Sequence, residues 1–327
     1  MTISLASLLR RVPPSVEARV TAARDRSRTT LRDALRTECR LVMRSADDVD
    51  ERGSLAQVPV EVVAGYPQIL NSIDFADDLQ HVLLLTRYRQ DLSKAASGAD
   101  GLIRLRGELR SLPRADAWAP GTDGAFTETR DWAREMLQRL DKQDPVGKVL
   151  AVSEDILGCY SYASTSSDEF AVNRASISLY WGVIGLVSDW LGCTVEDLTV
   201  VVLAHELAHA YTQLGADIEG RRWPSRAFSS AEIDLKEGLA QYYTVRSLKR
   251  LTVRFPEAMH TFETLLEKQP PAYHRHEPWA AESFSPEAVR RAMIEVRRWN
   301  EGTLEQFETR LKKASEDFKP LPGGLFH

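Results

Sequence analysis

The sequence contains few cysteines and lacks any long hydrophobic run. Its three cysteines, Cys39, Cys159 and Cys193, lie far apart in 327 residues and form no Cys-x-x-Cys pair. This usage is typical of reduced thiols and predicts a cytoplasmic protein without a disulfide framework. The most apolar stretch, residues 179–193, is shorter than the about 20 residues that cross a bilayer. The N-terminus also lacks the order of a secretory signal, because its short apolar stretch precedes its arginines. We therefore expect no membrane partner.

A strong net charge is also missing. The chain carries 42 lysines and arginines against 47 aspartates and glutamates, a net charge of −5. So mild a charge gives no reason to expect nucleic acid as a partner. Arginines gather before residue 45, but the acidic residues among them favour solvated helix faces over a binding tail. Hydrophobic residues make up 43% of the chain, which is ordinary for a globular protein of one large or two ordinary domains.

Several catalytic motifs are absent as well. The sequence has no Gly-x-Ser-x-Gly nucleophile turn, no glycine-rich phosphate loop ending in Gly-Lys-Ser/Thr, and no Gly-x-Gly-x-x-Gly turn after a predicted strand. These absences argue against the commonest forms of serine hydrolase, nucleotide hydrolase and dinucleotide-dependent oxidoreductase.

The pattern of apolar and turn-forming residues predicts an α+β fold in two parts. The first part, residues 1–144, is expected to be mostly helical, with helices at residues 15–44, 73–96 and 126–141. A stretch rich in proline and glycine, residues 112–124, is expected to interrupt it. The turn-forming run Asp144-Pro145-Val146-Gly147 is typical of a boundary, and residues 145–327 would form the second domain.

The second part is expected to combine a small sheet with helices. β-Branched and aromatic residues predict strands within residues 149–162 and at 176–180, and a helix at 181–191. Two C-terminal helices are expected as well. One is entered by Ser285-Pro286 and closes near Gly302, and the other is opened by Thr303 with Gln306.

One predicted helix carries two histidines with the spacing of a metal site. Thr194, with Asp197 after it, is typical of a helix N-cap, and Gly215 of a helix end. Within this helix stands His205-Glu206-Leu207-Ala208-His209, an HExxH motif. Residues four apart share a helix face, so both imidazoles can bind one ion. Glu206 is turned aside by about 100°, where it can take a proton from a zinc-bound water.

The next predicted helix offers a third ligand. Ser229 with Glu232 resembles a capping box, and the helix contains Glu232, Asp234 and Glu237 as candidate carboxylates. We choose Glu237 because the small residues Gly238 and Ala240 beside it would allow two helices to approach closely. Asp234 could instead orient a ligand histidine. Two imidazoles, a carboxylate and an open position favour zinc, one Zn²⁺ per chain.

These motifs resemble a known family. HELAHAYT, followed 28 positions after its last histidine by EGLAQYY, is similar to the gluzincin branch of the zincin metallopeptidases over about residues 145–250. The resemblance implies a zincin-like metallopeptidase domain at residues 145–327, in which His205, His209 and Glu237 bind zinc. It further implies a peptide or protein substrate, paired with an edge strand beside the active-site helix, for which residues 176–180 are the candidate.

Peptidases of this kind also need a donor for the oxyanion that forms at the attacked carbonyl. We select Tyr243 and His276 as catalytic candidates, with Tyr242, Tyr273 and His274 as alternatives. Two weaker hypotheses concern other side chains. Cys159 could occupy the open zinc position and keep the site latent. The arginines of the loop between the metal helices could favour an acidic substrate: Arg221, Arg222 and Arg226.

Three functions remain open from the residues alone. The first is a zinc-dependent peptidase, the second a metallohydrolase that cleaves another bond, and the third a non-catalytic zincin-like scaffold for binding or sensing. Glu206 distinguishes them, because only the two hydrolases need it as a base.

Overall fold

The computed structural model describes most of the chain, and its fold is α+β. The described residues are 3–43, 58–75, 85, 88–110, 123–152, 156–164, 172–281 and 284–317. Helices dominate them, and their strands form one sheet of three strands and another of two. No helix within these ranges is long and apolar enough to cross a membrane.

The three-stranded sheet has one apolar and one polar face. Across the sheet its strands are β2 (Val60–Val63), β5 (Val172–Tyr180) and β4 (Gly158–Ser164). β2 runs parallel to β5, and β4 runs antiparallel to it. Because successive side chains of a strand point to opposite faces, Ala175, Ile177 and Leu179 are buried together, while Ser176 and Ser178 between them are only partly buried.

The strand predicted at residues 176–180 exists as part of β5, but the prediction that it is an edge strand is wrong. β5 lies between its neighbours, with Ile177 opposite both Val60 and Tyr160. The strand at the border of the sheet that contacts α9 is β4. The partner β2 lies far from β5 in the sequence, so no short-range pattern could reveal this pairing.

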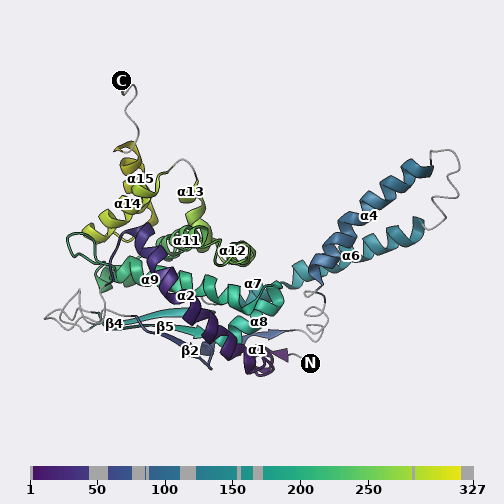
Figure 1. Cartoon of the computed structure of the whole chain (residues 1–327), viewed down its shortest axis with the longest axis horizontal. Helices are drawn as coiled ribbons and strands as arrows, with labels where there is room; N and C mark the ends of the chain where they lie inside the picture. Colours follow the sequence, from purple (N-terminus) through teal and green to yellow (C-terminus); the bar gives the residue numbers. More distant parts are fainter. Residues whose placement is uncertain are drawn as a thin grey trace, which may run out of the picture.

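Helix α9 (Val195–Leu214) is the central element of the fold. It packs against the sheet through β4 and β5 and against α2 (Ser15–Cys39), α8 (Trp181–Leu191), α11 (Ile233–Arg250) and α12 (Ala258–Leu266). Figure 1 shows α2 crossing close to α9. The strands β4 and β5 are drawn below α9 in this view. Nearly all side chains of α9 are buried, as expected for a helix that is apolar on every side.

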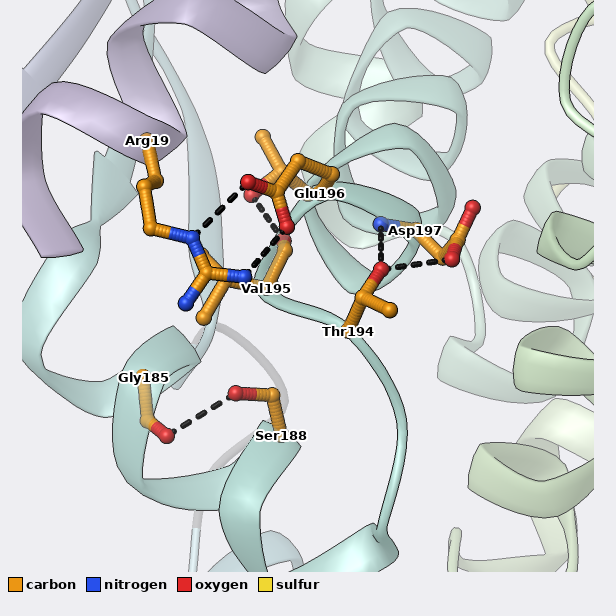
Figure 2. A network of polar contacts seen from close by, with 8 residues as sticks. Arg19, Gly185, Ser188, Thr194, Val195, Glu196 and Asp197 are labelled. Carbon is orange, nitrogen blue, oxygen red and sulfur yellow. Dashed lines mark hydrogen bonds and ion pairs between the residues drawn. The ribbon is translucent and has the colours of Figure 1, made fainter.

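The predicted start and end of α9 are confirmed. The backbone N–H of Asp197 donates to Thr194 Oγ1 at 3.0 Å, and the helix ends at Leu214, with Gly215 as its C-cap. Figure 2 shows this cap beside Arg19 of α2, which donates two hydrogen bonds to the carboxylate of Glu196 at 2.8 and 2.6 Å. The first turn of α9 is thus held by its own cap and by α2.

The remaining elements surround this body. The N-terminal ones are β1 (Ile3–Ser4), α1 (Leu5–Leu9), η1 (Gln68–Ser72), β3 (Asp74–Phe75), α4 (Arg89–Arg110), α6 (Asp123–Gln143) and α7 (Pro145–Leu150). The C-terminal ones are α10 (Ser225–Ser230), η2 (Pro271–His276), α13 (Glu277–Ala280), α14 (Pro286–Trp299) and α15 (Leu304–Asp317). In Figure 1, α4 and α6 form a hairpin that projects away from the other helices.

The contacts cross the boundary predicted at residue 144. β2 adds a strand to the sheet that contains β4 and β5, and α2 packs on α9 and α11. Side chains from both sides of residue 144, such as Leu35 and Leu203, belong to one hydrophobic core. The described contacts therefore join the two predicted regions, 1–144 and 145–327, to each other.

Several helix predictions are confirmed with shifted ends. The helix predicted at 15–44 ends at Cys39, because Arg40 takes a left-handed conformation with φ of 52°. The helix predicted at 126–141 is α6, and the helix at 181–191 is α8 with the same bounds. The Ser285 cap and the Thr303–Gln306 capping box also exist.

Other predictions failed. Residues 145–150 form α7, capped by the side chain of Asp144, instead of starting a strand at residue 149. A short apolar run does not distinguish a buried helix turn from a strand. In the helix predicted at 73–96, Asp74–Phe75 is a strand and α4 begins at Arg89. Residues 76–84 and most of the break predicted at 112–124 lie outside the described residues.

Candidate metal centre

Two packed helices bring the predicted metal ligands together. His205 and His209 lie one turn apart on α9, and Glu237 lies on α11, which packs against α9. Nitrogen or oxygen atoms of these three side chains all lie within 4.8 Å of one another, so the three residues could hold a metal ion. Gly238 does not serve the close approach to α9 that we expected. A Cβ there would lie 2.6 Å from Cη2 of Trp279, so Gly238 makes room for α13.

The donor atoms of the three side chains lie close together. The Nε2 atom of His205 lies 3.1 Å from Nε2 of His209 and 3.1 Å from Oε2 of Glu237. Oε1 of Glu237 lies 3.3 Å from Nε2 of His209. Tetrahedral zinc with ligands at about 2.0–2.1 Å requires donor atoms about 3.3 Å apart. The donor types and these separations, which involve both oxygens of Glu237, are therefore compatible with three ligands of one zinc ion.

The electrostatic setting keeps Glu237 ionised. Burial by itself would raise the pKa of this carboxyl group, which is only 4% exposed. The imidazoles of His209 and His205 outweigh that effect, and they hold the pKa of Glu237 well below its usual range. A deprotonated carboxylate is the form that binds metal. Glu237 is therefore in the ligating state at neutral pH.

Glu206 lies beside the triad, against the edge strand. Its side chain is 3% exposed and, with His205, lines a cavity. A Cβ on Gly158 of β4 would lie 2.9 Å from Cγ and 3.0 Å from Oε1 of Glu206. Glycine at position 158 thus allows the backbone of β4 to lie this close to the side chain of Glu206. Gly158 was not among the predicted residues, and its only signal in the sequence was a glycine within a predicted strand.

An aromatic ring supports His205. The rings of Tyr273 and His205 stack with centroids 5.6 Å apart and an interplanar angle of 24°. Within the described residues, Nδ1 of His205 is buried and has no hydrogen-bond partner. Metal-ligating histidines usually have such a partner, which fixes the orientation of the ring. Here the ring of His205 packs against the ring of Tyr273 instead.

His276 is connected to the site through Tyr273. Its Nδ1 atom lies 2.7 Å from the carbonyl oxygen of Tyr273, so an N–H at Nδ1 can donate to that oxygen. Burial lowers the pKa of His276, against the raising effect of that backbone oxygen. The neutral form is thus favoured near pH 7. The structure places this predicted residue beside the site, in a position that supports η2.

Tyr243 is not placed with the metal ligands. It follows Glu237 by six positions on α11, and at about 100° per residue it points to a different face of the helix. Its hydroxyl group is fully buried, which raises its pKa, and the neighbouring titratable groups include Cys39, Tyr242 and Arg297. The helical spacing itself could have excluded Tyr243 from the candidates.

The weaker candidates form contacts with residues other than the three predicted ligands. Asp234 accepts a hydrogen bond from Arg275 Nε at 2.8 Å, and His274 Nδ1 lies 2.7 Å from Glu277 Oε1. Glu232 is the backbone N-cap of α11, and its carboxylate accepts from the N–H of Leu304, so the predicted capping box with Ser229 does not form. Ser229 instead lies within α10.

Cys159 and the loop arginines do not join the triad either. Cys159 Sγ lies 3.3 Å from Ser161 Oγ, on the face of β4 opposite to Gly158. The thiol is therefore not placed to occupy a zinc position. Arg221 forms an ion pair with Glu219 at 3.1 Å, which reduces its attraction for an acidic substrate.

Two glutamines near the ligands were not predicted. Gln213 follows His209 by four positions, and its Oε1 accepts a hydrogen bond from Tyr160 Oη of β4 at 2.7 Å. Gln241 follows Glu237 by four positions, and its Nε2 donates to Gln269 Oε1 at 2.8 Å. Each glutamine shares a helix face with a predicted ligand, so the i, i+4 spacing that pointed to the two histidines could also have pointed to these residues.

Comparisons with known proteins found no match for this chain. No family model matches the chain, and no curated protein and no solved structure is similar to it.

Proposed function

We propose that this protein is a zinc-dependent hydrolase that cleaves peptide bonds, with one Zn²⁺ held by His205, His209 and Glu237. The observation that carries the proposal is the closeness of the three side chains, next to a buried glutamate: the two Nε2 atoms lie 3.1 Å apart, and each lies 3.1 or 3.3 Å from one carboxylate oxygen of Glu237. Three protein ligands are typical of catalytic zinc, because the fourth position stays open for water or substrate.

Glu206 is the proposed general base. A zinc ion at this site supplies Lewis acidity, which lowers the pKa of a water ligand to about 7 and polarises a carbonyl group. Glu206 follows a ligand directly in the sequence and shares a cavity with it, so its carboxylate can accept a proton there and return it to the leaving amine. Its burial, at 3% exposed, keeps bulk solvent from competing for this carboxylate.

Strand β4 is the proposed guide for an extended substrate. Among the described residues, β4 pairs only with β5, so its other edge is available for a further strand. Gly158 brings this strand against Glu206. A peptide that added to β4 would gain main-chain hydrogen bonds and present a carbonyl group near the triad. This assignment replaces residues 176–180 as the substrate-binding edge.

Metal analysis of untagged protein tests the proposal. We expect about one zinc per chain, lost in His205→Ala and weakened in Glu237→Ala. Glu206→Gln should keep the zinc and lose hydrolysis by roughly 10²- to 10⁴-fold, the range for one acid–base group. A wild type that folds but binds no zinc would contradict the proposal.

A substrate comparison then separates the alternatives. Matched peptide, ester and simple amide substrates should show cleavage of the peptides, abolished by Glu206→Gln. Cleavage of esters or amides alone would indicate a different metallohydrolase. A zinc-loaded protein that cleaves none of them, and whose behaviour does not depend on Glu206, would leave a binding or sensing scaffold.

A further inference from the structure

A second cavity lies where α1 and α2 meet α8, away from the predicted metal ligands. Its wall comes from α1, from the elbow between α1 and α2 (residues 10–14), from the first turns of α2, from α8 and from the start of α9. We call it the elbow cavity. Its volume is ≈ 500 Å³, whereas one water needs about 10–15 Å³ by this measure, so a molecule much larger than water can enter it.

The elbow cavity is separate from the candidate metal centre. Val195, which lines it, precedes His205 by ten positions on α9, which is about 15 Å along a helix. None of the three predicted ligands is part of its lining. A molecule in the elbow cavity would therefore not touch the metal site.

The shape of the elbow cavity is fixed by the chain around it. Pro13 and Pro14 restrict the backbone of the elbow, and two turn hydrogen bonds of 2.9 and 3.2 Å join the elbow to the end of α1. Gly185 brings α8 against this segment, because a Cβ there would lie 2.7 Å from Cγ1 of Val16 and 2.9 Å from Cγ1 of Val12. The wall is thus formed before any ligand binds.

Most of this wall is apolar. Trp190 and Leu186 of α8 are only 3% and 9% exposed, so they form its deeper part. The apolar side chains that the argument uses are Leu8, Val12, Val16, Leu186, Trp190 and Val195. Covering such side chains with the apolar part of a ligand removes surface from water on both sides, which favours binding.

Two arginines line the same cavity, but only one of them has its charge matched. Arg19 donates to both oxygens of Glu196, at 2.8 and 2.6 Å, beside α8 in Figure 2. Arg11 is exposed at the border of the cavity, and its guanidinium has no hydrogen-bonded or ion-paired acceptor among the described residues. Asp189 also lines the cavity and already has an interaction of its own. Arg11 is therefore the charged group that a ligand would meet.

This combination fits one class of ligand. A guanidinium binds a carboxylate through two parallel hydrogen bonds, and the single charges match. A phosphate group carries about −1.5 to −2 charges, more than one arginine balances. The apolar wall requires a hydrocarbon part beside the carboxylate.

We propose that the elbow cavity binds a small apolar carboxylate, such as a medium-chain fatty acid, with the carboxylate on Arg11 and the hydrocarbon chain against the wall of α1, α2 and α8. The inference goes beyond the proposed function and does not rest on it, because the two sites share no residue.

Calorimetric titration of the full chain with octanoate, butanoate and octanol tests the chemistry of the site. We expect one octanoate per chain. Octanol, which lacks the charge, should bind about tenfold more weakly, as expected for the loss of a hydrogen bond to a charged group. Butanoate, which is four methylene groups shorter, should also bind at least about tenfold more weakly, because it covers less of the apolar wall.

Three variants test the location. Arg11→Gln should lower the affinity for octanoate about tenfold and leave the affinity for octanol unchanged. Arg10→Gln is the matched control, because Arg10 is the exposed neighbouring arginine and does not line the cavity. It should bind octanoate as the wild type does. His205→Ala should also bind octanoate as the wild type does, which excludes a carboxylate held by metal.

Every outcome decides the inference. A folded chain that binds no octanoate, or that binds octanoate and octanol equally, would overturn it. So would equal losses in Arg11→Gln and Arg10→Gln. Octanoate binding that is lost in His205→Ala and kept in Arg11→Gln would place the carboxylate at the metal centre, which would overturn the elbow site and leave the proposed function intact.

Discussion

At the scale of single residues, the candidate site depends on a few side chains with distinct tasks. His205, His209 and Glu237 supply the donor atoms, and Glu206 stands beside them. Tyr273 stacks on His205, a proposed ligand, where a hydrogen-bonded carboxylate would be more usual. This difference makes the contribution of the aromatic ring measurable separately from that of its hydroxyl group.

Replacing Tyr273 tests this support. Tyr273→Ala removes the ring stacked on His205, so we expect zinc affinity to fall by about 10- to 100-fold, the range for groups that orient metal ligands. Tyr273→Phe keeps the ring and should bind zinc nearly as tightly as the wild type. Competition with a chromogenic chelator measures both. Equal losses in the two variants would show that the hydroxyl group, not stacking, is responsible.

Gly158 gives a second prediction at this scale. In Gly158→Ala the new methyl group would lie 2.8 Å from Cγ1 of Val202 and 2.9 Å from Cγ of Glu206, so one neighbour must shift. We expect a loss of about 1–3 kcal/mol in the free energy of unfolding and a larger relative loss of hydrolysis. Urea unfolding and peptide cleavage measure the two effects.

A matched glycine provides the control for this substitution. Gly65 has open space where a Cβ would be added, so Gly65→Ala should leave both stability and hydrolysis close to wild type. Full activity in Gly158→Ala would contradict the close approach of β4 to Glu206.

At the scale of elements, α9 combines a buried body with a well-defined first turn. The proposed metal ligands His205 and His209 lie in its second half, while Thr194 caps its start far from the cavity that Glu206 lines. The capping and the chemistry of this helix should therefore be separable by mutation.

Removing the cap tests this separation. Thr194→Ala deletes the acceptor for the N–H of Asp197, which should lower the free energy of unfolding by about 1 kcal/mol. Zinc content should stay near one per chain. Thr264→Ala is a suitable control, because that hydroxyl group bonds only within its own helix. Loss of zinc in a folded Thr194→Ala variant would show that the first turn also controls the position of the ligands.

At the scale of the whole molecule, segments before and after residue 144 depend on one another. β2 completes the sheet, and α2 covers α9 and α11. Separating them would expose core side chains such as Leu203 and Ile177 to water. At about 25 cal/mol per Å² of apolar surface, such exposure exceeds the stability of a typical domain when several core residues are uncovered.

Dividing the chain at residue 144 tests this dependence. The fragment 145–327 alone should show no cooperative thermal unfolding and should bind a dye specific for exposed apolar surface. Addition of the separately produced fragment 1–144 should restore a cooperative transition, followed by circular dichroism. A fragment 145–327 that unfolds cooperatively and binds zinc by itself would show that the region is an independent domain.

The sequence by itself determined the parts that depend on local spacing. Two histidines four apart lie on one face of any helix, and the caps at Thr194, Ser285 and Thr303 follow from side-chain chemistry within one turn. Glu237, chosen from the sequence, does lie close to both histidines, although Gly238 makes room for Trp279 and not for α9.

Only the tertiary structure decided what depends on distant pairing. The order β2-β5-β4, the placement of β4 and Gly158 beside Glu206, and the stacking of Tyr273 on His205 join segments far apart in the chain. Such contacts depend on the packing of the whole core, so no local periodicity in the sequence predicts them. For the same reason the sequence could point to the candidate ligands, while the cavity and the strand beside them depend on the fold.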